Sequence, residues 1–136
     1  MKTESWHTKA RIDFRDSAAT GPLDPEEISR RLNLPADSKW ITGDRIGKNG
    51  TVRRRTNGWQ IMTEKVEGAN PADQIRELLA RLGNSWSIAC ELGKILEAEI
   101  SLEIWTDGRM FPPLIFEPKL LAAAIEMNAT VDIDMY

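Results

Sequence analysis

The chain has 136 residues and a formal net charge of −3, and hydrophobic residues make up 41% of it. This length suits one domain, and this composition is too apolar for a disordered chain and too acidic for a uniformly basic nucleic-acid binder. A single cysteine and a single histidine exclude an internal disulfide and nearly exclude a zinc site built from these residues, so we expect no metal and no other cofactor.

The first predicted element is a strand over residues 8–15, where apolar and charged side chains alternate. Asp24-Pro25 then predicts the start of a helix, because aspartate caps a helix and proline fits its first position. Pro35 disfavours helical geometry in the residue before it, so this helix should end near Asn33.

The stretch 39–65 is predicted to be extended but irregular, with a short strand near its start. Asn57-Gly58 is typical of a two-residue turn between strands. We therefore expect a hairpin that joins 52–56 to 59–65 across this turn.

Two helices are predicted in the middle of the chain. Asn70-Pro71 repeats the pattern of a capping residue followed by proline, and apolar residues at helical spacing continue to Leu82. After a break, Ser85 is expected to cap a further helix, in which Cys90 is a small core residue.

The C-terminal part reads as strand, loop, helix and strand. Alternation predicts strands over 98–106 and 130–136, Glu117-Pro118 predicts the start of the helix between them, and 114–116 is a candidate short strand. This order repeats that of the N-terminal part and suggests two similar α/β halves, although an acid followed by proline is also a common helix start.

These elements predict an α+β fold of two layers, with helices packed on one face of an antiparallel or mixed sheet. Acidic side chains on the strands argue against helices on the other face. We expect residues 1–136 to form a single domain. The predicted core contains Ile12, Phe14, Ile28, Leu32, Leu78, Leu82, Ile100, Leu102, Ile104, Leu121, Ile125, Val131 and Ile133.

Four groups of residues stand out by their order and spacing: Asp24-Pro25 with Ile28, Leu32 and Leu34; Trp40 with Gly43-Asp44; Gly58-Trp59; and Asp132-Ile133-Asp134-Met135-Tyr136. With them the chain resembles the bacterial domain-of-unknown-function family 4279, over nearly its whole length. The resemblance implies a bacterial, single-domain α+β protein. It implies no activity, cofactor or catalytic residue.

A basic stretch holds six positive residues against one acid, namely Lys39, Arg45, Lys48, Arg53, Arg54 and Arg55. Guanidinium groups bind phosphate with paired hydrogen bonds, and exposed indoles such as the flanking Trp40 and Trp59 can stack on bases. One hypothesis is therefore phosphate or nucleic-acid binding through Arg45, Lys48, Arg53, Arg54 and Arg55. The alternative is a solvated loop, which the acidic balance of the whole chain favours.

If the three alternating strands share one sheet, its outer face carries five carboxylates: Asp13, Glu99, Glu103, Asp132 and Asp134. Paired carboxylates suit glycoside hydrolysis, so a hydrolase is a further hypothesis. The alternative is cross-strand pairing with Arg11 and Arg15 on a solvated or self-associating face. Trp105 and Tyr136 fall on the same face and are the candidate anchors of an interface.

These patterns favour a non-catalytic binding or protein-interaction domain, of which a toxin-neutralising immunity role is one form. The expected partner is another protein or a second copy of the chain. A Cys–His catalyst is disfavoured, because Cys90 and His7 lie at opposite ends of the pattern. The chain starts without the apolar core of a signal peptide and has no apolar run of about 20 residues, so we expect a cytoplasmic protein that binds no membrane.

Overall fold

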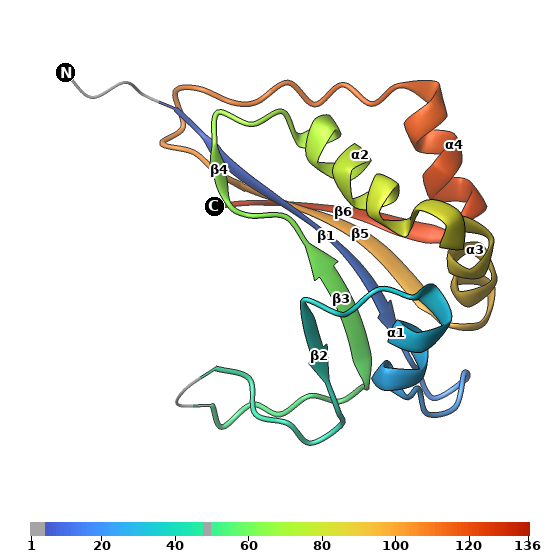
Figure 1. The fold of residues 1–136 in the computed structure, drawn as a ribbon. Coiled ribbons are helices and arrows are strands. Elements are labelled where there is room, and N and C mark those ends of the chain that lie inside the picture. The colour runs from blue at the N-terminus through green and yellow to red at the C-terminus, as the bar shows by residue number, and fades with distance from the viewer. Residues whose placement is uncertain (1–4, 48–49) are drawn as a thin grey trace.

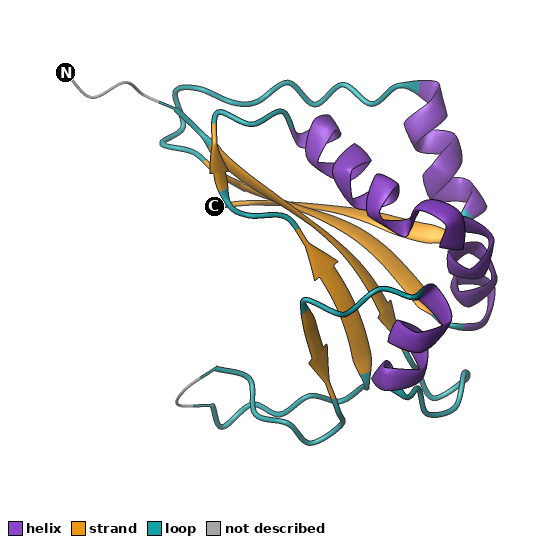
Figure 2. Ribbon diagram, in the orientation of Figure 1, coloured by secondary structure: helices purple, strands orange, loops and turns teal. Residues whose placement is uncertain are grey.

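The computed structural model describes residues 5–47 and 50–136, and in it a mixed sheet of six strands is covered by helices on one face (Figures 1 and 2). The strands are β1 (His7–Arg15), β2 (Ser38–Trp40), β3 (Gly58–Met62), β4 (Val66–Glu67), β5 (Glu97–Trp105) and β6 (Ala129–Met135). Their order in the sheet is β2-β3-β1-β5-β6, and β4 pairs with the start of β1. The predicted α+β class is confirmed.

The helices are α1 (Pro25–Leu32), α2 (Pro71–Leu82), α3 (Trp86–Ile95) and α4 (Pro118–Glu126), with a 3-10 turn η1 (Gly83–Ser85) before α3. Asp24 and Asn70 cap α1 and α2, since each side chain accepts a hydrogen bond at 3.0 Å from the N–H two residues later. The capping role predicted for Ser85 is wrong. Its hydroxyl donates instead to the carbonyl oxygen of Leu32 at 2.7 Å and so ties α1 to the start of α3. No helix among the described residues is both long and apolar enough to cross a membrane.

The core forms between these helices and the central antiparallel strands β1 and β5. Ile12 pairs with Ile100 across the two strands, and both are buried. Leu78 of α2 and Leu32 of α1 are buried in the same cluster. Alternation therefore identified the inner face of β1 and β5 correctly.

The predicted core is wrong at one edge of the sheet. Leu121, Ile125, Val131 and Ile133 are exposed. In the parallel pairing of β5 with β6, Ile133 lies beside Leu102, so its side chain is on the helix-covered face as expected. It is exposed because β6 is the edge strand of the sheet and none of the described helices extends beyond it (Figure 1).

The predicted hairpin is also wrong. β3 pairs with β1 and β2, while the chain at 52–56 folds back on the segment after β2 through a bridge between Arg45 and Arg53. The reason lies at Asn57, which does not sit in a hairpin turn. Its main-chain N–H donates to Asp16 at 2.9 Å and its side-chain amide donates to the carbonyl oxygen of Leu23 at 2.8 Å, so it joins the loop before α1.

Residues 114–116, a candidate short strand, form part of the loop between β5 and α4. The two halves repeat one order of elements, β1-α1-β2 and β5-α4-β6, with the two strands of each half parallel. They differ in pairing, because β3 lies between β1 and β2 whereas β5 and β6 are neighbours.

Candidate functional site

The open face of the sheet, which none of the described helices covers, carries two cross-strand pairs between the predicted arginines and carboxylates. Arg11 forms an ion pair with Glu103 at 2.6 Å, and Arg15 forms one with Glu99 at 2.7 Å. The sequence offered two interpretations of this face: a hydrolase site, or cross-strand pairs of arginine with carboxylates. The two ion pairs agree with the second, because each joins β1 to its neighbour β5.

Asp13 lies between these two arginines along β1 and is buried. Gln60 of β3 donates a hydrogen bond to its carboxyl group at 2.6 Å. Burial raises the pKa of Asp13, although the hydrogen bond from Gln60 and the charges of Arg11 and Arg15 act in the opposite direction. The carboxyl group is therefore held where its ionised form is disfavoured.

The raised pKa of Asp13 gives a pH-dependent prediction. The folded chain binds this proton more tightly than the unfolded chain, so the contribution of Asp13 to the free energy of unfolding falls as the pH rises from 3.8 through the folded pKa. We expect Asp13→Asn to unfold at a higher urea midpoint than wild type at neutral pH, with the difference shrinking towards about pH 4. Asp107→Asn, on an exposed loop, is the control. A lower midpoint for Asp13→Asn at neutral pH would show that the ionised form is stabilising.

The two candidate interface anchors lie together. The rings of Trp105 and Tyr136 are stacked with centroids 5.4 Å apart, and the ammonium group of Lys65 lies 4.0 Å from the Trp105 centroid. Tyr136 is exposed and Trp105 is half-buried. They form an aromatic platform at the end of β5 and β6.

The candidate basic residues are only partly available to a ligand. The Arg54 guanidinium lies 4.3 Å over the ring of Trp40, and Arg53 donates to the carbonyl oxygen of Gly43 at 2.9 Å. Arg45 and Arg55 are exposed, and Lys48 lies outside the described residues.

The two flanking indoles offer no surface to bases, because both are buried. Trp40 packs against Gly58, and Trp59 donates from its ring nitrogen to the hydroxyl of Ser29 at 2.9 Å inside the core.

Cys90 and His7 are not brought together. Cys90 is buried in α3, whereas His7 begins β1 and pairs with Trp105 at the other end of the sheet (Figure 1). Burial, and then the carboxylate of Glu126, raise the pKa of the Cys90 thiol, which disfavours the nucleophilic thiolate. Among the described residues no three His, Cys, Asp or Glu side chains form a group that could hold a metal ion.

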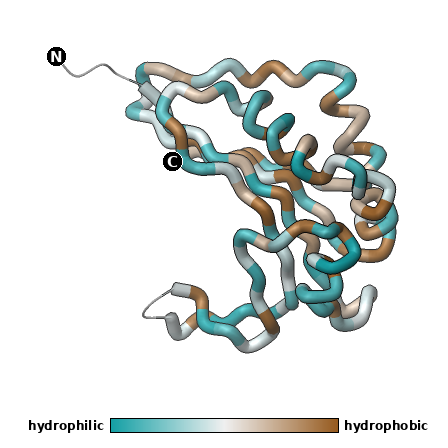
Figure 3. The backbone as a smooth tube through the Cα atoms, viewed as in Figure 1, coloured by the Kyte–Doolittle hydropathy of each residue, from teal (hydrophilic) through white to brown (hydrophobic). Residues whose placement is uncertain are grey.

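A site that the sequence patterns missed lies at the β6 edge of the sheet, on α4 and β6. Five large apolar side chains are exposed there; they form the surface that we call the α4–β6 patch: Leu121 (45%), Ile125 (78%), Val131 (44%), Ile133 (38%) and Met135 (50%). In Figure 3 the tube carries hydrophobic stretches along α4. The available signal was the unbroken apolar run 120–125, because a helix that is apolar on all sides has a second face to bury.

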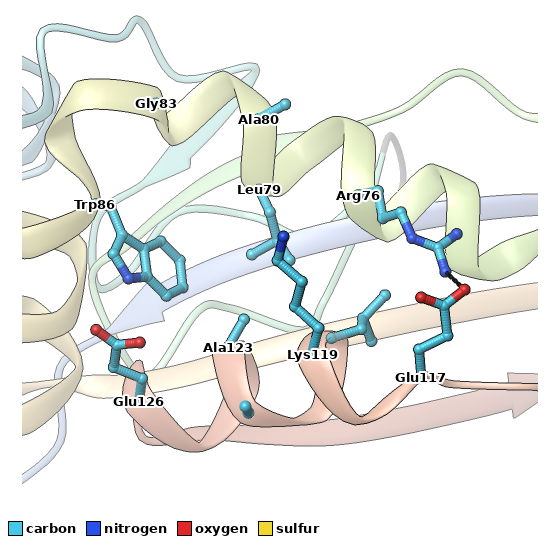
Figure 4. Close-up of a pocket in the computed structure, with 11 residues that line it drawn as sticks. Arg76, Leu79, Ala80, Gly83, Trp86, Glu117, Lys119, Ala123 and Glu126 are labelled. Carbon is cyan, nitrogen blue, oxygen red and sulfur yellow. Dashed lines mark hydrogen bonds and ion pairs between the residues drawn. The ribbon is translucent and has the colours of Figure 1, made fainter.

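The helical periodicity of α4 places Leu121 and Ile125, the two residues that it contributes to the patch, on the side of the helix above β6. A groove of about 740 Å³ separates α4 from α2 (Figure 4). Lys119, Ala123 and Glu126 line it from α4, and Arg76 of α2 closes one end through an ion pair with Glu117 at 2.9 Å.

Leu121 and Ile125 are one helical turn apart and do not line this groove. At 100° per residue they lie on the opposite flank of α4, which faces away from α2 and towards the free edge of the sheet. The flank of α4 that carries Leu121 and Ile125 therefore lies at the same edge of the sheet as the exposed side chains of β6.

A family model described as a domain of unknown function (DUF4279) matches residues 17–136. The chain belongs to the DUF4279 family. Neither a curated protein nor a solved structure matches it. The DUF4279 match includes α4 and β6 but begins after β1, the central strand of the sheet, so this fold depends on residues that precede the matched region.

Proposed function

We propose that this protein is a non-catalytic domain that binds another protein, and that the α4–β6 patch is the surface it uses. The observation that supports this best is the exposure of five large apolar side chains on two adjoining elements. Exposed apolar patches mark interaction sites, because covering them removes apolar surface from water. Trp105 and Tyr136 lie on the other face of the same edge and supply aromatic area of the kind that anchors interfaces.

The arrangement of the carboxylates supports binding over hydrolysis. Glu99 and Glu103 are engaged by arginine, and Asp13 is enclosed beside Gln60. A hydrolase needs one carboxyl group that can give up a proton beside a second that can attack or activate water, both reachable by substrate. Two carboxyl groups on this face have a raised pKa: the buried Asp13, and Asp132, whose pKa is raised first by a hydrogen bond with Asp134. Asp132 and Asp134 do not line the hollows of about 740, 380 and 400 Å³ in the described part of the chain, so none of these hollows would hold a substrate against this pair.

Site-specific photo-crosslinking tests the proposal. A benzoylphenylalanine in place of Ile125, in cells that naturally make the protein, is expected to form one ultraviolet-dependent adduct with another protein. The matched control carries the same group in place of Ile41, which is also exposed but follows β2 at the opposite edge of the sheet. The adduct should disappear when Ile133→Lys is added. Adducts of equal yield from both positions would contradict the assignment of the patch.

A second candidate function is phosphate binding by the loop after β2. The observation that favours it is a hollow of about 380 Å³ that is lined by exposed Arg55 and by the hydroxyl-bearing residues Ser17 and Thr56. A cation beside hydroxyl groups suits a phosphate oxygen. Asp16 also lines this hollow and weakens the case.

Retention on heparin tests phosphate binding by the loop after β2. If the loop binds polyanions, wild type is retained at roughly 50 mM salt, and Arg45→Glu with Arg55→Glu elutes in the wash. Arg30→Glu with Lys119→Glu changes the net charge equally outside the loop and should stay bound. A wild-type chain that is not retained excludes polyanion binding by this loop.

A further inference from the structure

We propose that the outer edge of β6 accepts an extended segment of a partner protein, in which apolar residues alternate with lysine or arginine. The inference rests on the proposed protein-binding function and specifies the form and the chemistry of the partner. Addition of a strand to an open sheet edge is an established mode of peptide recognition.

The main chain of β6 has one side available. The N–H of Tyr136 donates to the carbonyl oxygen of Ile104 at 2.8 Å, and its carbonyl oxygen accepts from the N–H of Thr106 at 3.2 Å. Tyr136 thus points both groups at β5. Since these directions alternate along a strand, the main-chain groups of Val131, Ile133 and Met135 point to the outer edge. No described strand pairs with that edge.

The same three residues carry the apolar side chains of the patch. An incoming strand that bonds to their N–H and carbonyl groups would place every second side chain beside Val131, Ile133 and Met135, on the side of α4. Those side chains must be apolar to cover the patch. The open edge and the exposed apolar surface are therefore one feature, and a single extended segment satisfies both.

The remaining side chains of the incoming strand would lie beside acidic side chains of β6. Asp132 and Asp134 alternate with the apolar residues of β6 and face the open side of the sheet. Asp132 and Asp134 are two residues apart on one face of β6, and a hydrogen bond with Asp134, then burial and the charge of Asp134, raise the pKa of Asp132. Arg11 opposes this effect, but its guanidinium is held in the ion pair with Glu103. Lysine or arginine opposite the two aspartates would relieve the repulsion.

The same acids disfavour a second copy of this chain. The antiparallel register that pairs the whole of Ala129–Met135 with a second β6 sets Asp132 directly opposite its own counterpart. Centring the pair on Ile133 sets Asp132 against Asp134 instead. Like charges directly opposite one another destabilise a strand pair, so charge complementarity selects a basic partner strand.

Binding of labelled peptides, followed by fluorescence anisotropy at low salt, tests the proposal. The probe alternates lysine and valine over 7 residues, the length of β6. One control peptide has the same composition with its lysines and valines grouped, and another has glutamate in place of lysine. We expect the alternating lysine peptide to bind at least about tenfold more tightly than either control. The double variant Asp132→Lys, Asp134→Lys should reverse the preference in favour of the glutamate peptide.

Two variants at one position separate the main chain from the side chain. Ile133→Pro removes an N–H that points to the outer edge, whereas Ile133→Ala keeps it and also shortens the side chain. Ile133→Pro should bind the alternating lysine peptide roughly 2–10-fold more weakly than Ile133→Ala, the effect of one lost main-chain hydrogen bond.

Equal binding of the grouped and alternating lysine peptides, or no binding of any peptide, would overturn strand addition at β6. An unchanged preference in the charge-swapped variant would overturn it as well. The charge-swapped variant still tests strand addition at β6 if Ile133→Pro does not fold. A specific adduct from position 125 together with failure of the peptides would leave the protein-binding function in place and exclude this form of the partner.

Discussion

Leu102→Ala is expected to lower the free energy of unfolding by roughly 2–5 kcal/mol, as measured by urea denaturation. Leu102 is buried at the centre of the sheet, between β1 and β6, and its loss would leave a cavity under the helices. The size of the effect reflects both the lost burial of the side chain and the incomplete collapse of the space around it.

The neighbouring residue on β6 supplies the matched control. Ile133 lies beside Leu102 in the parallel pair and on the same face, but it is exposed. Ile133→Ala should therefore cost only about 1 kcal/mol, because much of the deleted surface is already in water. Equal losses from the two variants would mean that β6 is covered in the protein in solution, and the α4–β6 patch would not exist as a free surface.

Gly93→Ala is expected to destabilise the chain by about 1–3 kcal/mol, against the usual preference of helices for alanine. Gly93 lies in α3 against the main chain of Met127, and an added Cβ would overlap the Met127 carbonyl oxygen. The side-chain amide of Asn128 donates to the carbonyl oxygen of Gly93 at 3.0 Å, so the helix is held at this close approach. The substitution must push α3 away from the junction between α4 and β6.

The control for this prediction is Lys94→Ala, the next residue of α3, which is exposed. It should change the free energy of unfolding by less than about 0.5 kcal/mol. Because glycine in a helix costs roughly 0.5–1 kcal/mol relative to alanine, a chain stabilised by Gly93→Ala would show that α3 has room at this point and that the close contact is absent.

Local chemistry predicted the elements whose signals lie within a few residues. Asp24-Pro25 and Asn70-Pro71 begin helices in the structure because capping and a preset proline geometry act on adjacent residues. Alternation identified the inner face of β1 for the same reason, because successive side chains of a strand point to opposite faces of the sheet.

Long-range packing explains what the sequence did not predict. Parity placed Ile133 on the correct face, but whether a helix covers that face at the edge of the sheet depends on the path of the chain around α4. Asn57 carried a strong turn signal that its hydrogen bonds to the loop before α1 overrode. For the candidate site, alternation along the strands correctly placed Trp105 and Tyr136 on one face. The apolar patch could not be predicted in this way, because it exists only where the described helices leave the β6 edge uncovered.

Amide hydrogen exchange along β6 tests the central claim most directly. In the dilute chain alone, the amides of Val131, Ile133 and Met135 should exchange at least about tenfold faster than those of Asp132 and Asp134, because only the latter point at β5. This alternation would establish a strand that is paired on one side and open on the other. Slow exchange at all five positions would show that the outer edge is already covered, and would contradict its role as the site where a partner strand is added.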